Sequence, residues 1–200
     1  MEIKKSMNLS YTDMYEMNDL EERRLYINNE IDEKVVDTIV YHIMRYNRED
    51  KGIDVKSRKP IILYINSNGG SVPDGYAVID AIMNSITPVC TVNQGYCYSM
   101  GFLIFLAGHK RYCMPSATFL MHDGSTMTWD STAKAKDRMD FETRQVEEYT
   151  KKYIMARTSI DEKLYDEKYR VEWYFYPTEA KQNGVLDYII GVDCTIDEIV

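Results

Sequence analysis

Hydrophobic positions alternate between helical and strand spacing along most of the chain. Residues 32–46 carry apolar side chains three and four positions apart, which predicts an amphipathic helix. Residues 61–66 (IILYIN) form a continuous apolar run that is rich in β-branched side chains and too short for a core helix. We therefore predict a strand that is buried on both faces. A turn over 67–73 leads from this strand into a helix over 73–85, with Pro73 near its first turn.

The same alternation continues to the end of the chain. The further predicted elements are strands over 88–93, 110–114, 117–121, 173–176 and 185–190, an apolar helix over 99–107 and a short helix over 177–183 closed by Gly184. Buried strands that alternate with helices are typical of an α/β fold built on a mainly parallel sheet. No internal repeat and no low-complexity linker interrupts the chain, so we expect one main domain.

The segment from Ser131 to Arg157 differs from the rest because it is long, charged and helical in pattern. Its apolar positions form only a thin stripe, made of Met139, Val146, Tyr149, Tyr153 and Ile154. A helix this polar is not buried within its own domain, so we expect it to project or to pack against another subunit. Beyond it, Ser159 and Glu162 have the spacing of a capping box, which predicts a further helix.

Composition and charge narrow the classes of function. The net charge of −8 argues against nucleic acid as a partner, because binding to phosphates requires a basic face. No run approaches the roughly 18 apolar residues of a membrane span, and the first residues lack the apolar core of a signal peptide. We therefore expect a cytoplasmic protein that does not insert into membranes.

The cysteines indicate neither a metal centre nor disulfides. Cys90, Cys97, Cys113 and Cys194 form no CxxC pair and have no spacing to histidine that is typical of zinc sites. Buried free thiols in a reducing compartment account for them better. The glycine-rich turn before residue 71 also lacks the GK[ST] ending of a phosphate-binding loop. We expect neither a metal nor a cofactor.

Two glycine- and serine-containing segments could supply chemistry. The segment 66–71 follows a buried strand, and its paired Gly69 and Gly70 would let free backbone amides approach a ligand, as an oxyanion hole requires. Taken alone, this segment is more typical of an ordinary turn. Ser99 begins an apolar helix, where free amides and the positive end of the helix dipole would stabilise a developing alkoxide. Taken alone, a serine there is more often a helix cap.

His122 is the third candidate, at the end of the predicted strand 117–121. The carboxyl ends of parallel strands are where ligands and catalytic groups gather in α/β folds. The alternative is a surface histidine at a turn, since a turn sequence follows it. If a serine hydrolase operates here, His122 is the natural general base, because His42 lies on a predicted helix and His109 stands beside two cations.

Together these segments carry a specific resemblance. The stretches YINSNGG, GYCYSMG and RYCMPSATFLMHD are similar, in this order, to the Clp-type serine peptidases, the proteolytic subunits of ATP-dependent Clp proteases. EAKQNGVLDYI also resembles the family's ending, so the resemblance runs from about Leu20 to Ile190. It implies a crotonase-like αββ superhelix, with an N-terminal segment over 1–19 that is flexible or lines a pore and a single peptidase domain over 20–200. The charged helix corresponds to a projecting handle over about 123–157.

Carried over position by position, the resemblance implies roles for four residues. Ser99 is the nucleophile and His122 is the general base. The backbone amides of Gly70 and Met100 donate to the tetrahedral oxyanion. The spacing from Gly70 to Ser99 requires no insertion relative to the family, and the spacing from Ser99 to His122 is about two residues shorter, in a turn where length varies freely.

The acid of the triad is where the sequence departs from the family. The family's aspartate falls on Glu172, which also carries a carboxylate but is one methylene longer. Asp166 is the alternative acid if the loop before it differs. A merely solvated Glu172 would make this a catalytically weak or inactive ring or scaffold subunit. A further hypothesis is a crotonase acting on an acyl-CoA thioester, although that class requires no Ser–His pair.

The resemblance also implies a substrate and partners. It predicts a serine endopeptidase that cleaves unfolded polypeptides inside a homo-oligomeric chamber of heptameric rings, which the handles join into a tetradecamer. A Clp-type AAA+ unfoldase would supply the substrate. The N-terminal residues match no pore loop of the family, and Asn84 stands where the docking groove has an aromatic, although Ile62 and Tyr64 keep their apolar character. Asp123 and Gly124 also replace the family's residues after the histidine, so we expect a divergent member.

Overall fold

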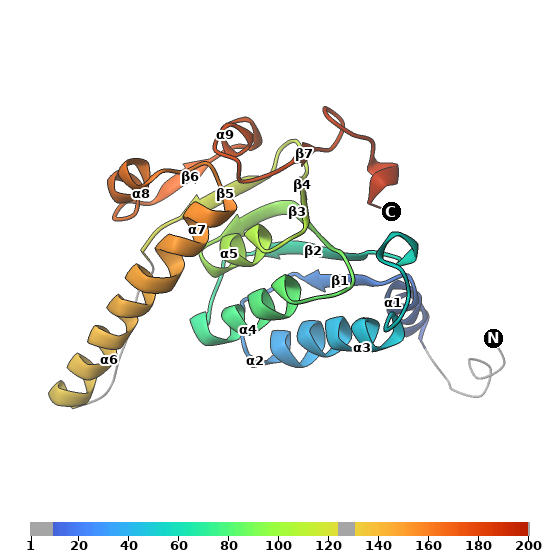
Figure 1. The fold of residues 1–200 in the computed structure, drawn as a ribbon, viewed down its shortest axis with the longest axis horizontal. Coiled ribbons are helices and arrows are strands. Elements are labelled where there is room, and N and C mark those ends of the chain that lie inside the picture. The colour runs from blue at the N-terminus through green and yellow to red at the C-terminus, as the bar shows by residue number, and fades with distance from the viewer. Residues whose placement is uncertain (1–9, 124–130, 200) are drawn as a thin grey trace.

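The computed structural model describes residues 10–123 and 131–199, except for the side chains of 146 and 147 (Figure 1). The strands are β1 Arg24–Ile27, β2 Ile61–Ser67, β3 Val89–Tyr98, β4 Lys110–Cys113, β5 Thr118–Met121, β6 Trp173–Phe175 and β7 Tyr188–Ile189. β1, β2, β3, β4 and β7 form a parallel sheet in this order, which confirms the predicted α/β class. β5 runs parallel to the end of β3, and β6 pairs with β5 in the antiparallel direction.

Helices cover the sheet and extend beyond it. They are α1 Tyr11–Glu21, α2 Glu33–Val35, η2 Val36–Val40, α3 Tyr41–Glu49, η3 Val55–Ser57, α4 Val72–Met83, α5 Met100–Leu106, α6 Thr132–Gln145, η4 Val146–Thr150, α7 Lys151–Arg157, α8 Glu162–Lys168, α9 Pro177–Gln182 and η5 Ile196–Glu198. α3 and α4 lie along one side of the sheet, and α6 to α7 project from the body as one rod (Figure 1). The charged segment is thus the projecting helix that its polarity predicts; residues 124–130 of the expected handle lie outside the described residues.

β3 changes its neighbouring strand along its length, just before it reaches Ser99. β3 pairs with β4 as far as Asn93 and with β5 from Tyr96 onward. Asn93 is fully buried at the bend between them, where its side-chain amide donates to the carbonyl of Thr118 and its side-chain oxygen accepts from the amide of Gly95. These hydrogen bonds fix the direction in which the second half of β3 leaves the main sheet.

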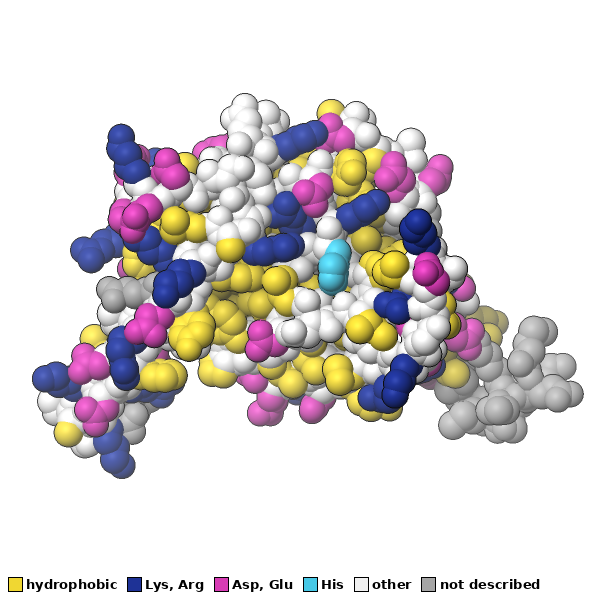
Figure 2. All heavy atoms as spheres, in the orientation of Figure 1, with side chains coloured by type: hydrophobic (Ala, Val, Ile, Leu, Met, Phe, Trp, Pro, Cys, Tyr) yellow, Lys and Arg dark blue, Asp and Glu magenta, His cyan; other side chains and the backbone are white. Residues whose placement is uncertain are grey.

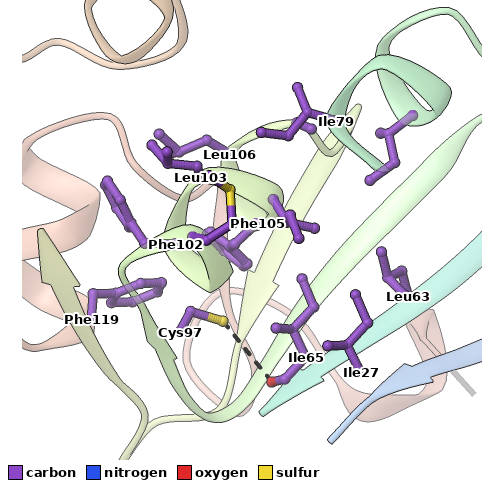
Figure 3. Packing of buried hydrophobic residues seen from close by; sticks show 14 of the residues in the cluster. Ile27, Leu63, Ile65, Ile79, Cys97, Phe102, Leu103, Phe105, Leu106 and Phe119 are labelled. Carbon is purple, nitrogen blue, oxygen red and sulfur yellow. Dashed lines mark hydrogen bonds between the residues drawn. The ribbon is translucent and has the colours of Figure 1, made fainter. Parts of the chain in front are cut away.

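The short helix α5 lies in the centre of the core, and all of its residues are buried. Figure 3 shows its aromatic and aliphatic side chains, among them Phe102 and Phe105, packed among residues of the neighbouring strands. Each such side chain contributes roughly 1.5–3 kcal/mol on burial. Side chains of other elements donate to the carbonyls at its C-terminal end: Thr91 to Phe105, Tyr153 to Leu103 and Arg157 to Leu106. The helix that starts after Ser99 is therefore held at both its surface and its end.

A second, smaller apolar cluster lies apart from the main core. It consists of Ile62, Tyr64, Cys90, Val92, Tyr112, Ile190 and Ile199. The C-terminal segment contributes Ile199, whose carbonyl accepts a hydrogen bond from the Tyr64 hydroxyl. Ile62 and Tyr64, which the resemblance assigns to a docking groove, are therefore only 7% and 6% exposed within the single chain.

One local prediction was wrong, and one helix was not predicted. The segment 1–19 contains a regular helix from Tyr11, capped by a reciprocal pair of hydrogen bonds between Ser10 and Asp13, whereas residues 1–9 lie outside the described residues. α1 has no buried residue, so it left no apolar pattern to find. The helix α8 is capped by Asp161, whose carboxylate accepts from the Leu164 amide, and not by Ser159.

A buried ion pair ties β1 to the end of α3. The guanidinium of Arg23 donates to both carboxylate oxygens of Asp50 at 2.7 and 2.8 Å, and the hydroxyl of Thr87 donates to the same carboxylate at 2.7 Å. Asp50 is only 3% exposed. The hydrogen bonds from Arg23 lower the pKa of the Asp50 carboxyl below its usual value.

Asp50→Asn should lower the free energy of unfolding by about 3 kcal/mol, because it removes the buried charge that accepts two hydrogen bonds from the Arg23 guanidinium. The half-exposed Glu49, at 3.5 Å, is then the counter-charge left beside Arg23 among the described residues. Since the folded pKa of Asp50 is lowered, its contribution is complete above about pH 4 and is lost as the pH falls through the folded pKa. Urea unfolding at pH 7 and at lower pH measures both effects. The exposed pair of Arg138 and Glu142 is the control, because Glu142→Gln should change stability by only about 0.5 kcal/mol. Equal losses for the two variants would contradict this prediction.

Candidate active site

Ser99 lies in a strained turn between β3 and α5. Its φ and ψ are 53° and −122°, and Arg23 is the one other non-glycine residue with positive φ in the described part of the chain. Such a conformation costs about 1–3 kcal/mol and is found mainly at functional sites. The Ser99 hydroxyl makes no capping hydrogen bond to α5 among the described residues, so the interpretation of this serine as a side-chain helix cap is wrong. Ser99 thus begins a buried helix in a strained conformation, and its hydroxyl does not cap that helix within the described residues.

His122 is brought to Ser99 by the pairing of β3 with β5. Tyr98 is in register with Leu120, and the Ser99 amide donates to the Leu120 carbonyl at 3.0 Å. His122 comes two residues after this contact and directly after the last residue of β5. Its Nε2 atom is buried and has no hydrogen-bond partner among the described residues. A buried nitrogen without a partner is uncommon.

Glu172 and His122 both adjoin the last residue pair of β5 and β6. Leu120 pairs with Tyr174 and Met121 with Trp173; His122 directly follows Met121, and Glu172 directly precedes Trp173. No hydrogen bond joins these two side chains within the described residues; the Glu172 carboxylate accepts one from the hydroxyl of Tyr174 at 3.1 Å.

Asp166, the alternative acid, lies elsewhere. It belongs to α8, and its carboxylate pairs with Lys151 of the projecting helix at 2.8 Å. Lys151 also binds Glu162 at 2.8 Å, so it joins α8 to the base of the handle. Of the two acids considered, Glu172 is thus the one that adjoins the strand pair leading to the histidine.

The loop after β2 is held firmly against neighbouring backbone. The Ser67 hydroxyl donates to the Asn29 carbonyl at 2.6 Å and accepts from the Gly69 amide at 3.1 Å. Ile31 donates to the Gly69 carbonyl and accepts from the Ser71 amide, each at 2.8 Å. These contacts leave the Gly70 amide without an acceptor among the described residues, and the same is true of the Met100 amide.

Gly69 is the residue that allows this loop to touch the serine. A Cβ atom placed on it would lie 2.7 Å from the Ser99 Cβ and 2.9 Å from the Met100 nitrogen, and its φ is 100°. Gly70 is equally restricted, because a Cβ there would lie 2.4 Å from the Ile31 carbonyl oxygen. The paired glycines are the signal of this contact in the sequence, but the sequence does not distinguish the role of Gly69 from that of Gly70. The amides of Gly70 and Met100 and the side chain of Ser99 thus lie where two closely packed backbone segments meet.

The nearby thiols do not compete with the serine. Burial raises the pKa of the Cys97 thiol well above its usual value, although Cys97 comes only two residues before Ser99. Burial also raises the pKa of Cys90 to about 11 and that of Cys113 to about 12. These three thiols are free and buried, as predicted, whereas Cys194 is partly exposed.

Neither a metal cluster nor a membrane span is found in the parts that the structure describes. No group of three or more His, Cys, Asp or Glu side chains among residues 10–123 and 131–199 could hold an ion. Within the same residues, every helix is too short or too polar to cross a bilayer.

Comparisons with known proteins agree with the residue patterns. A family model described as Clp protease matches residues 6–193. The ATP-dependent Clp protease proteolytic subunit 3 of Synechococcus sp. is 30% identical over 178 residues, which cover 85% of this chain and 83% of that protein. The proteolytic subunit 2 of Tropheryma whipplei is 31% identical over 178 residues, which cover 85% of this chain and 92% of that protein.

A solved structure shows the same fold. A ClpP1 mutant from Listeria monocytogenes superposes with a TM-score of 0.77 at 21% identity, covering 93% of this chain and 99% of that one. The arrangement of β1 to β7 with a projecting helix is therefore the ClpP-type fold that the sequence motifs predict.

Proposed function

The chain belongs to the Clp protease family, a family of peptidases, and on this premise we propose that it is a serine endopeptidase that cleaves unfolded polypeptides inside an oligomeric ring. The observation that carries the proposal is the strained conformation of Ser99, whose hydroxyl does not cap α5 in the described residues. The Ser99 amide donates a hydrogen bond to the carbonyl of Leu120, which lies two residues before His122. Strain of this kind at a strand-to-helix turn is what exposes a nucleophilic serine in other hydrolases.

The first half of the reaction forms an acyl-enzyme. Ser99 Oγ attacks the scissile carbonyl carbon while its proton passes to His122 Nε2. The carbonyl oxygen becomes an oxyanion, which accepts hydrogen bonds from the amides of Gly70 and Met100. When the C–N bond breaks, His122 gives the proton to the leaving amine. Glu172 orients the imidazole and stabilises its charged form.

The second half releases the acid product. Water attacks the ester carbonyl carbon, and His122 takes the proton that the water loses. The bond to Ser99 Oγ then breaks, and His122 returns the proton to this oxygen. The site is thereby restored without a metal or cofactor.

Apolar surface on the handle supports assembly into rings. Met139, Phe141 and Tyr149 are all more than half exposed on a helix that projects from the body. A groove of about 770 Å³ lies where α4 faces this helix, with Ile79, Met83 and Tyr153 among its lining residues. Figure 2 shows hydrophobic side chains gathered between the handle and the body. We propose heptameric rings joined through the handles into a tetradecamer, supplied by a Clp-type AAA+ unfoldase.

One observation favours a second candidate, an inactive ring or scaffold subunit. The carboxylate of Glu172 bonds to Tyr174 and not to His122 in the described residues. The crotonase alternative has no such support, because the matching family and the relatives are proteolytic.

Labelling with a fluorophosphonate probe separates these candidates. We expect one label per chain on the peptide that contains Ser99, identified by mass spectrometry, because the probe exchanges its fluoride for an activated serine oxygen. His122→Ala should slow labelling by about 10²-fold or more, since the base that takes the proton is lost. His42→Gln is the control, because His42 lies on α3, and it should label at the rate of the wild type. A folded, ring-forming protein that takes no label would contradict the proposal and identify a scaffold.

A further inference from the structure

Glu172 lacks the restraints expected of a triad acid. Its side chain is exposed, and it has one more rotatable bond than the aspartate it replaces. Freedom of this kind costs free energy when a side chain must hold one geometry. The hydrogen bond from the Tyr174 hydroxyl to Oε2, at 3.1 Å, is the restraint that the described residues provide. Glu172 directly precedes β6 and Tyr174 lies within it, two positions further along the chain.

Tyr174 is itself held in place by the segment that carries the nucleophile. Its ring meets the ring of Tyr98 edge-on, with centroids 5.6 Å apart and planes at 87°. The Tyr98 hydroxyl is hydrogen-bonded to Thr118 Oγ1 at 2.8 Å, which fixes this ring in turn. Tyr98 directly precedes Ser99, and Leu120 lies between the two tyrosines in the register of β3, β5 and β6. The phenol that binds the acid is thus supported by the residue next to the serine.

We propose that Tyr174 is a positioning residue, which binds one carboxylate oxygen of Glu172 and leaves the other for His122. This inference rests on the proposed function, because it assigns Glu172 to the triad. A carboxylate accepts hydrogen bonds through both oxygens, so the bond from Tyr174 to Oε2 does not exclude one from the imidazole to Oε1. The bond to Glu172 also raises the pKa of Tyr174, so the phenol keeps its proton and remains a donor. A glutamate thereby serves where the family has the shorter and stiffer aspartate.

The test is Tyr174→Phe, which keeps the ring and its contact with Tyr98 but removes the hydroxyl. We expect kcat for peptide hydrolysis to fall by about three- to tenfold with KM unchanged, as for the loss of one hydrogen bond. We also expect the acid limb of the pH–rate profile to move to lower pH, because a less ordered Glu172 stabilises the His122 imidazolium less. A purely structural defect would lower the rate without moving this limb.

Two further variants make the test specific. Tyr176→Phe removes a more exposed tyrosine hydroxyl just beyond β6 and should leave kcat and the pH profile unchanged. In a Glu172→Ala background, Tyr174→Phe should have no further effect, because its target is absent.

The outcomes separate this inference from the proposed function. Unchanged kcat and pH profile in Tyr174→Phe would overturn the role of Tyr174 and leave the peptidase intact. An equal fall in kcat from Tyr174→Phe in the wild type and in the Glu172→Ala background would also overturn the role of Tyr174. Absence of Ser99-dependent hydrolysis in the wild-type protein would overturn the proposed function and this inference together. Mass in solution confirms that each variant assembles as the wild type does.

Discussion

Ser99→Ala should lower kcat for peptide hydrolysis by about 10³-fold or more while leaving the fold and the assembly unchanged. The hydroxyl is the attacking group in the proposed reaction, and the members of a triad act as a unit, so no neighbour replaces it. The nearby Cys97 cannot take over, because burial keeps its thiol protonated. The hydroxyl also makes no capping hydrogen bond among the described residues, so its removal costs the helix nothing. Initial rates on a fluorogenic peptide, together with mass in solution, measure both parts.

The strain at Ser99 supplies a second readout. Glycine adopts positive φ without the steric penalty that alanine shares with serine. We therefore expect Ser99→Gly to be as inactive as Ser99→Ala but more stable, by about 1 kcal/mol. Ser85→Ala is the control for activity, since the Ser85 hydroxyl bonds to Asn47 and Thr87 just beyond the other end of α4. Full activity in either Ser99 variant would exclude this residue as the nucleophile.

Gly69→Ala should lower kcat by about 10²-fold or more. The new Cβ would lie 2.7 Å from the Ser99 Cβ and 2.9 Å from the Met100 nitrogen, so the serine or the oxyanion-binding amide must move. Loss of a single oxyanion donor costs about 10²- to 10³-fold in comparable hydrolases. The loop cannot yield easily, because Ser67 and Ile31 hold Gly69 through its amide and carbonyl.

Gly52→Ala is the matched control for Gly69→Ala. Gly52 has a φ of 86°, close to the 100° of Gly69, but a Cβ there meets nothing within 4 Å. Gly52→Ala should therefore lose about 1–2 kcal/mol of stability to backbone strain alone, with activity retained. Gly69→Ala should lose more stability, because its Cβ also clashes with Ser99 and Met100, and it should lose activity. Comparable activity in the two variants, measured at saturating peptide, would show that the loop does not form the oxyanion site.

Much of the fold follows from local pattern. β2 agrees with the predicted strand to within one residue, because residues buried on both faces leave a continuous apolar run. β1 and α1 were not predicted, since the former spans only Arg24–Ile27 and the latter buries nothing. β3 continues to Tyr98, beyond the predicted end at residue 93, because pairing with β5 overrides the polar Gln94 and Gly95.

The sequence by itself determined the types of group proposed to do the chemistry and their order along the chain: paired glycines, a serine at a helix start, a histidine at a strand end and a distant acid. It could not determine how these groups are arranged. The pairing of β5 with β6 ends at the residues beside His122 and Glu172, Ser99 has a positive φ between β3 and the buried α5, and Tyr174 donates a hydrogen bond to Glu172. These relations depend on hydrogen bonds between residues far apart in the chain, and no local pattern of apolar and polar positions encodes them.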